Sequence, residues 1–476
     1  MTLGTTDKDL FGDLISENQN FDYFTSTFYT RVEVDQCISN NQMVILKGDL
    51  GSGKSAILRR AENILKNRND TTKEITILPI RGAQGGLPQN ISTLDEFTKA
   101  WRQHVFYSLA INNGAKMDRP KTFSEIVVAD LATNEGKRNP PFVETILKVF
   151  KIQYFPEKKD LLNGAFSLEN ICLRLLEGST QTLFVFFDEI DFDFSNTKLF
   201  KNKLLGFFFA CKELIQNQKI KIRVSIKTQT WEILKSLVPT SLNQYLIEIK
   251  WSREELKNLL LHRLIAHKQR INKTYIFDQS NKLIGEFIQN PFPWKGGVKD
   301  ADQGISIFSG QRPRFFLDLC ERARKKAVKL EISIIPYTVF ELVLPEFGQN
   351  QVSVICEENR CSCNRIIDII GSFYDKFSHY TRAEIDWHLS KLINVYKNPR
   401  IKITGKESTE PDDILRLLVQ IGFIHPRTGR TWDGEDHAFF TIDCVQPKSM
   451  DYERVWEIHP MFRQHLRLKQ NPTLRF

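Results

Sequence analysis

Apolar residues in the first half of the chain form short runs and helical stripes that alternate. The run "MVILKG", which ends at Gly48, predicts a buried strand, and "KSAILRRAENILK" after it places Ile57, Ala61, Ile64 and Leu65 on one face of a helix. By the same patterns, further strands are predicted at 74–80, 183–187 and 220–226, and helices at 92–112, 141–152, 167–177 and 198–217. Strands that alternate with helices favour a parallel sheet, which binds ligands at the carboxyl ends of its strands.

The second half of the chain is predicted to be mainly helical up to residue 345 and mixed beyond it. Capping boxes are predicted at Ser252 with Glu255 and at Thr381 with Glu384. Helices at 364–377, 382–393 and 412–420 then precede two short strands around a basic-tipped loop in "IGFIHPRTGRTWDGEDHAFFTID", and "EIHPMFRQHL" is interpreted as a closing helix. Helices followed by a β-hairpin describe a winged-helix domain.

The turn between the first strand and its helix fits the pattern G-x-x-x-x-G-K-[ST] at every position. Glycines let successive backbone N–H groups point toward a polyphosphate, and the helix N-terminus adds positive potential. Lys54 would reach the β and γ phosphates, and the Ser55 hydroxyl would bind Mg²⁺. The predicted nucleotide-binding residues of this loop are Gly48, Asp49, Leu50, Gly51, Ser52, Gly53, Lys54, Ser55 and Ala56. A loop that merely caps an ordinary helix is the disfavoured alternative.

Two acidic residues follow the apolar run 183–187, in "TLFVFFDEIDFD". On a strand adjacent to the first, Asp188 would hold Mg²⁺ through water and Glu189 would polarise the attacking water. The presence of Glu189 disfavours a nucleotide-binding scaffold without catalysis. Asp191 is interpreted equally well as a supporting residue of this site or as a solvated side chain.

Polar residues at two later positions are candidates for contacts to the γ phosphate. Lys227 and Thr228 follow the strand 220–226 and lie either near that phosphate or at the start of a loop. Arg312 and Arg314 stand at a helix start, which is unfavourable for cations unless an anion compensates them. A phosphate is the anion that the sequence suggests.

These motifs define the predicted fold class: an α/β P-loop NTPase with a three-layer αβα parallel sheet, followed by a helical lid and a winged-helix domain. The P-loop core is expected over 1–247, with a helical insertion at about 85–165 because the connection between two strands there is long. The lid is expected over 248–345 and the winged-helix domain over 346–476.

Composition and charge narrow the class of protein only a little. The chain has 476 residues, of which 41% are hydrophobic and 26% charged, as in an ordinary soluble globular protein. The 66 Lys and Arg against 57 Asp and Glu give a net charge of +9, which leaves contact with nucleic acid open, although evenly spread charge favours a solvated surface.

The cysteines and the apolar runs predict a cytoplasmic location. Eight cysteines are scattered along the chain without a leader-like start, which favours reduced thiols. Only Cys356, Cys361 and Cys363 are clustered, and their irregular spacing favours loop cysteines over a zinc site. No apolar run reaches the roughly 18 residues of a membrane span.

Taken together, the motifs resemble those of AAA+ ATPases of the origin-recognition and STAND type, and more closely a family of bacterial P-loop ATPases described as FunZ-like. The resemblance covers nearly the whole chain and is carried in order by "FGDLISENQNFDYF", "GDLGSGKSA", "FVFFDEID", "SIKTQTW", "WSREEL", "GQRPRFFLDLC" and "WEIHP".

The resemblance implies roles for the polar residues named above. Lys227 or Thr228 would occupy the sensor 1 position, and Arg314, with Arg312, the sensor 2 position on a lid that closes over the γ phosphate. Lys-Thr-Gln at sensor 1 departs from the family, in which an arginine and an aspartate are commoner. The resemblance also implies a homo-oligomer or a partner effector protein.

The predicted function is a Mg²⁺-dependent ATPase that acts as a nucleotide-dependent switch, and the resemblance adds a role in bacterial defence against phage. The alternative is an ATP-regulated DNA-binding protein that uses its winged helix. Asp412 and Asp413, at the start of the predicted recognition helix, would be repelled by DNA phosphates, which disfavours base reading. Arg427 and Arg430 of the wing, or "KNPRIKITGK", leave backbone contacts open.

Overall fold

The computed structural model describes most of the chain, and the account below concerns that part alone. The residues outside it are 1–9, 12–20, 68–74, 82–86, 89, 139–166, 180–181, 193–196, 273–279, 295–296, 361, 398–399, 404–405, 427–454 and 473–476. The helix predicted at 141–152, Cys361, Arg427 and Arg430 lie outside the described residues, as does the second strand of the predicted hairpin.

The chain divides into two compact units. One comprises Arg31–Asp49 and Lys54–Ile249, and the other comprises Met1–Thr30, Leu50–Gly53 and Lys250–Phe476. The tip of the predicted P-loop therefore groups with the C-terminal half of the chain. The division into three domains stays a prediction.

The first unit is built on a sheet of five parallel strands. These are β1 (Met43–Gly48), β2 (Ile75–Arg81), β3 (Thr182–Asp188), β4 (Ile220–Lys227) and β5 (Leu246–Glu248), in the order β2-β3-β4-β1-β5. The first four fall where the apolar runs predict them, and β5 has too short a run to be recognised. This strand order, with a P-loop after β1, is that of the predicted αβα P-loop NTPase fold.

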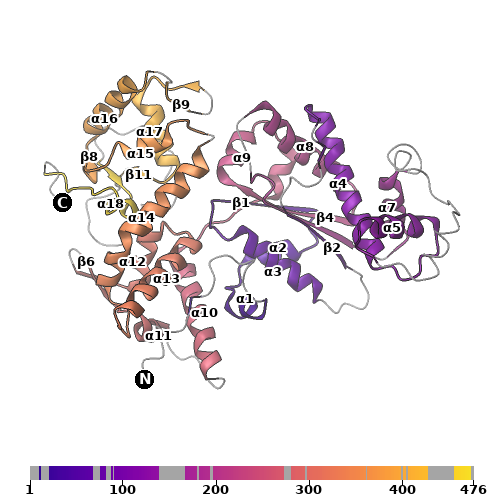
Figure 1. Cartoon of the computed structure of the whole chain (residues 1–476), viewed down its shortest axis with the longest axis horizontal. Coiled ribbons are helices and arrows are strands. Elements are labelled where there is room, and N and C mark those ends of the chain that lie inside the picture. Colours follow the sequence, from indigo (N-terminus) through magenta and orange to yellow (C-terminus); the bar gives the residue numbers. More distant parts are fainter. Residues whose placement is uncertain are drawn as a thin grey trace. The chain divides into compact units, whose positions relative to one another are not determined.

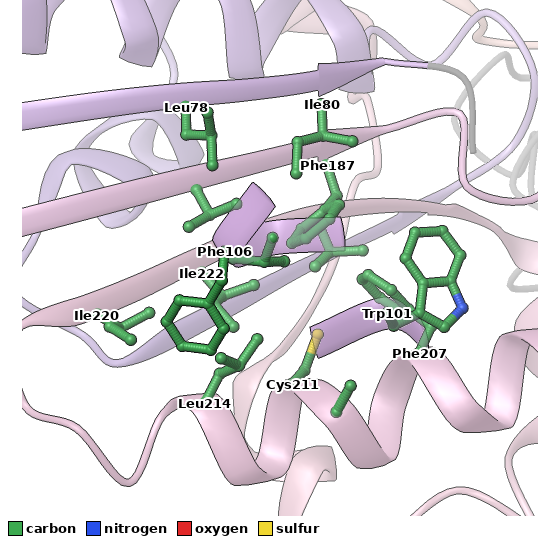
Figure 2. Packing of buried hydrophobic residues seen from close by; sticks show 14 of the residues in the cluster. Leu78, Ile80, Trp101, Phe106, Phe187, Phe207, Cys211, Leu214, Ile220 and Ile222 are labelled. Carbon is green, nitrogen blue, oxygen red and sulfur yellow. The ribbon is translucent and has the colours of Figure 1, made fainter. Parts of the chain in front are cut away.

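Helices cover both faces of this sheet (Figure 1). On one face lie α4 (Leu94–Ala115) and α8 (Lys198–Leu214), while α5 (Phe123–Asn134) and α7 (Leu168–Glu177) pack against α4. All four helices share a hydrophobic cluster with the strands. The rings of Trp101, Phe187 and Phe207 meet edge to face in that cluster (Figure 2). The other face carries α2 (Val32–Ile38) and α3 (Lys54–Lys66), which completes three layers.

A buried arginine ties α2 to the sheet. Arg223 of β4 is fully buried, and its guanidinium donates hydrogen bonds to the carbonyl oxygens of Cys37, Ser39 (2.7 Å) and Asn41 (2.9 Å) at the end of α2. It also lies over the Phe184 ring at 5.1 Å. Burial lowers the pKa of Arg223 to about 10, so it stays cationic at neutral pH and complements the carboxyl end of the helix dipole.

The second unit is mainly helical from residue 250 onward. The capping boxes at Ser252 with Glu255 and at Thr381 with Glu384 are both present. The long helix α14 runs through Pro345, so the boundary expected at 345/346 does not coincide with an end of secondary structure. Its helices up to that point are α1 (Phe21–Thr27), α10 (Arg253–Ile271), α11 (Ser280–Phe287), α12 (Ala301–Ser309), α13 (Pro313–Lys329) and α14 (Tyr337–Asn359), with a hairpin of β6 (Phe292–Trp294) and β7 (Gly297–Lys299).

The last 110 or so residues combine short helices and short strands, and their assignment to a winged-helix domain stays a prediction. An antiparallel sheet in the order β11-β12-β8 closes this region. The elements are α15 (Ile366–Gly371), β8 (His379–Tyr380), α16 (Arg382–Val395), β9 (Lys402–Ile403), β10 (Lys406–Glu407), α17 (Pro411–Gln420), β11 (Ile424–Pro426), β12 (Trp456–Ile458) and α18 (Pro460–Arg463). The prediction missed β12 and began the closing helix too early, because a three-residue strand leaves too little alternation to recognise.

Packing in this region explains the acidic start of α17. The Arg382 side chain is 2% exposed and pairs with Asp386 at 2.8 Å and with Asp412 of α17. Burying a guanidinium requires such partners, so the Asp412 carboxylate has a structural role that joins α16 to α17.

Replacing Arg223 with methionine should lower the free energy of unfolding by about 2–4 kcal/mol, because buried carbonyls at the end of α2 would lose their donors. Urea denaturation followed by circular dichroism measures the loss. The matched control is Lys221→Met, which lies on the same face of β4 and removes one side-chain hydrogen bond, to Gln42. Equal effects of the two substitutions would contradict this role of Arg223.

Candidate functional site

The flanks of the predicted P-loop are set by β1 and α3. Gly48 is the last residue of β1, and Lys54 and Ser55 begin α3. The Lys54 ammonium donates to the carbonyl oxygens of Gly48 at 2.7 Å and Asp49 at 2.9 Å. The lysine thus lies folded across the loop that it terminates, and Ala56 follows in the first turn of α3.

The loop has a backbone conformation that glycine favours. Gly51 and Gly53 have φ angles of +79° and +94°, which residues with a Cβ rarely adopt. A Cβ at Gly51 would also lie 3.0 Å from the Cβ of Arg314. The backbone thus requires Gly53, which the motif specifies, and also Gly51, at a position that the motif leaves open. The loop fits a polyphosphate bound by backbone N–H groups.

The acidic residues lie where β3 ends. Asp188 is the last residue of the strand, and Glu189 follows it with a φ of +57°, an uncommon conformation for a residue with a side chain. The Glu189 N–H donates to Asp188 Oδ1 at 3.1 Å, and the Ser225 hydroxyl donates to the same oxygen. Ser225 was not predicted; its signal was a small polar residue in an otherwise apolar and basic strand.

The sequence analysis expected the acidic strand, β3, to be adjacent to β1, and this expectation is wrong. β4 lies between β1 and β3, and its register pairs Lys227 with Gly48. Sheet order depends on long-range pairing, which local apolar patterns do not encode. The consequence is that Lys227, rather than an acidic residue, neighbours the first glycine of the loop.

Asp191 connects the ends of β3 and β4. It is 4% exposed, and its Oδ2 accepts a hydrogen bond from the Lys227 N–H at 2.9 Å. Asp191 is therefore not a solvated side chain, and its role as a supporting residue of the site stays a prediction. Thr228 begins α9 (Thr228–Leu234), with Lys227 at the N-cap position.

The tip of the loop, Leu50–Gly53, belongs to the unit that contains Lys250–Phe476, and the contacts described next lie within that unit. The Arg314 N–H donates to the Gly51 carbonyl at 3.2 Å, and the Trp251 indole donates to the Ser52 carbonyl at 2.8 Å. Arg314 thus meets the loop through its backbone.

A carboxylate side chain faces Arg312. Arg312 Nη1 lies 3.5 Å from Oε2 of Glu358, near the end of α14, and the guanidinium lies over the Phe315 ring at 5.2 Å. The other Glu358 oxygen accepts a hydrogen bond from the Leu50 N–H at 3.1 Å. No local pattern could have indicated Glu358, which lies more than 300 residues from the loop in sequence.

Comparison with solved structures finds similar proteins of low sequence identity. The chain is similar to the Walker-type ATPase PABY2304 of Pyrococcus abyssi (13% identity, 96% of this chain and 100% of that chain, TM-score 0.41). It is also similar to the ORC2 protein of Aeropyrum pernix in ADPNP and ADP complexes (9%, 97% and 96%, 0.42) and to ORC1 of the same organism with DNA (11%, 89% and 90%, 0.38). The fold assignment rests on the strand order and the P-loop.

No protein-family model and no curated protein matches the chain.

Two further expectations concern membranes and metal ions. Within the described residues, no helix has both the length and the apolar character needed to cross a bilayer. Cys356 and Cys363 are buried thiols without a disulfide, and the described part of the chain has no group of three or more His, Cys, Asp or Glu that could hold a metal.

The backbone of Glu189 yields a test that is independent of ligands. Because a left-handed residue with a Cβ costs about 1 kcal/mol relative to glycine, Glu189→Gly should leave the free energy of unfolding unchanged or raise it by up to about 1 kcal/mol. Glu189→Val should lower it, since β-branched residues tolerate this conformation least. Thermal denaturation of both variants measures the difference, and equal stability would show that the turn relaxes.

Proposed function

We propose that this protein is a Mg²⁺-dependent ATPase that acts as a nucleotide-dependent switch. The observation that carries the proposal is the loop 48–55, with two glycines at positive φ and a lysine and serine at the start of α3. Asp188 and Glu189 end a strand of the same parallel sheet, so they lie at the same edge as the loop.

The residue types at this edge suit a metal-bound triphosphate. Mg²⁺ prefers oxygen ligands, and the Ser55 hydroxyl and the Asp188 carboxylate would hold it. When bound, Mg²⁺ would neutralise charge on the phosphates. Lys54 would bind the β and γ phosphates in place of the two loop carbonyls, and Glu189 would accept a proton from the attacking water. Ser225 would keep Asp188 oriented toward the metal.

Two further sets of residues would detect the γ phosphate. Lys227, with Thr228, is held at the end of β4 by Asp191, beside Gly48, which supports a sensor 1 role. Arg312 and Arg314 remain the proposed sensor 2 residues, supported by the contact of Arg314 with Gly51. The assignment to the FunZ-like family and the role in defence against phage stay predictions from the resemblance alone, as do a homo-oligomer and an effector partner. The cytoplasmic location stays a prediction from the cysteines and the apolar runs.

Two substitutions separate binding from turnover. Lys54→Ala should weaken Mg-ATP binding by about a hundredfold, because it removes charge-assisted hydrogen bonds to phosphate. Glu189→Gln should bind ATP as the native protein does and hydrolyse it about 10²–10⁴ times more slowly. Equilibrium binding and single-turnover assays measure the two effects. Native turnover by Glu189→Gln would show that this carboxylate is not the general base.

The alternative, an ATP-regulated DNA-binding protein, is tested by the ATPase rate and the mass with and without double-stranded DNA. We expect ATP to drive assembly and DNA to leave the rate unchanged, because the acidic first turn of α17 opposes phosphate. Arg382 and Asp412 give that turn a structural role instead. Stimulation by DNA would favour the alternative.

A further inference from the structure

Glu358 connects two groups that are suited to hold an anion. Its Oε1 accepts the Leu50 N–H at 3.1 Å, and its Oε2 lies 3.5 Å from the Arg312 guanidinium. We call this set of contacts the Glu358 bridge. The side chains of Glu358 and Arg312 are 5% and 10% exposed, so the pair lies in an environment where charges require partners.

A phosphate and a carboxylate bind the same donors. Backbone N–H groups of a glycine-rich loop and a guanidinium are both donors for phosphate oxygens, and both form charge-assisted hydrogen bonds with a carboxylate. An amide N–H has a single hydrogen to donate, and the Glu358 carboxylate already accepts it at Leu50. A phosphate that uses the Leu50 N–H must therefore displace Glu358 from it, and a phosphate at Arg312 would compete with the Glu358 carboxylate for the positive charge of the guanidinium.

The helix that carries Glu358 is packed firmly against the C-terminal segment. At Gly348 of α14, an added Cβ would lie 2.6 Å from the Met461 carbonyl oxygen of α18. Near Arg312, the partner of Glu358 in the bridge, an added Cβ at Gly310 would lie 2.9 Å from the Met461 side chain and 3.7 Å from the His459 ring. The residues that flank the bridge thus contact the same short segment, 459–461.

The charge of Arg312 also acts on His459, in the segment 459–461. The pKa of His459 is lowered well below its ordinary value by burial first, and then by His425, Arg463 and Arg312, while Glu457 opposes them. His459 is therefore neutral beside Arg312, and Glu358 supplies the negative charge that faces this arginine.

We propose that the Glu358 bridge is an autoinhibitory contact, in which a carboxylate of α14 competes with nucleotide phosphate for the Leu50 amide and Arg312. This inference rests on the proposed nucleotide site. Displacement of Glu358 would release α14 from the loop tip. A partner whose binding moves α14 or the segment 459–461 would therefore change the affinity for nucleotide, and nucleotide would change the affinity for that partner by the same factor.

The test compares Mg-ATP affinity of the native full-length chain with that of Glu358→Gln and Glu358→Asp, by isothermal titration calorimetry. Gln keeps the size but removes the charge, and Asp keeps the charge but shortens the reach. Both should bind ATP at least about fivefold more tightly than the native protein, as typical couplings between sites do. Glu357→Gln, at the neighbouring exposed position, is the matched control and should bind as the native protein does.

The outcomes distinguish the two proposals. Tighter binding by both variants, or binding by the variants where the native chain does not bind, supports the bridge as an autoinhibitory contact. Native affinity in both variants, with folding confirmed by circular dichroism, overturns the bridge but leaves the ATPase assignment intact. Absence of ATP binding in the native chain and in every variant overturns the nucleotide site and the bridge with it.

Discussion

The need of buried backbone groups for hydrogen-bond partners is the constraint on which this structure depends. It is most severe in the loop 48–55, where glycines leave the main chain uncovered. Lys54 binds the carbonyls at the start of the loop, while Trp251, Arg314 and Glu358 bind the groups at its tip. Arg223 satisfies the same requirement at the end of α2, with a buried cation in place of a helical continuation.

These partners differ in chemistry, and the difference matters for function. The loop carbonyls at the tip accept hydrogen bonds from Trp251 and Arg314, and a phosphate does not compete for a carbonyl because both are acceptors. Lys54 differs, because its ammonium is attracted more strongly to phosphate than to a neutral carbonyl. The Leu50 N–H, by contrast, is donated to a carboxylate side chain, that of Glu358. Trp251 and Arg314 therefore hold the loop in shape, whereas Glu358 is the residue that would compete with phosphate for it.

Much of the fold could be predicted from the sequence, because apolar runs and capping residues are local signals. Four strands, the helices α3, α4, α7 and α8 and both capping boxes lie where the patterns place them, and the P-loop motif starts at the end of β1 in the structure as in the pattern. What failed depended on long-range pairing. The insertion of β4 between β1 and β3 follows from contacts between segments distant in sequence, and β12, which is only three residues long, is held by its pairing with β11 and β8.

The same reason explains the parts of the site that the sequence did not indicate. Ser225 lies 37 residues from the Asp188 carboxylate to which it donates, and Glu358 lies 46 residues from Arg312. The sequence correctly indicated that Arg312 needs an anion, but it could not show that the protein supplies one itself. An acidic residue on a long helix has many ordinary explanations, and only its placement separates them.

Gly348 allows α14 to pack closely against the C-terminal segment. With no side chain there, the helix axis approaches the Met461 carbonyl more closely than any other residue would permit. Position 358 lies ten residues farther along the same helix, about 15 Å at 1.5 Å per residue, so one continuous helix spans the distance between the C-terminal segment and the loop tip.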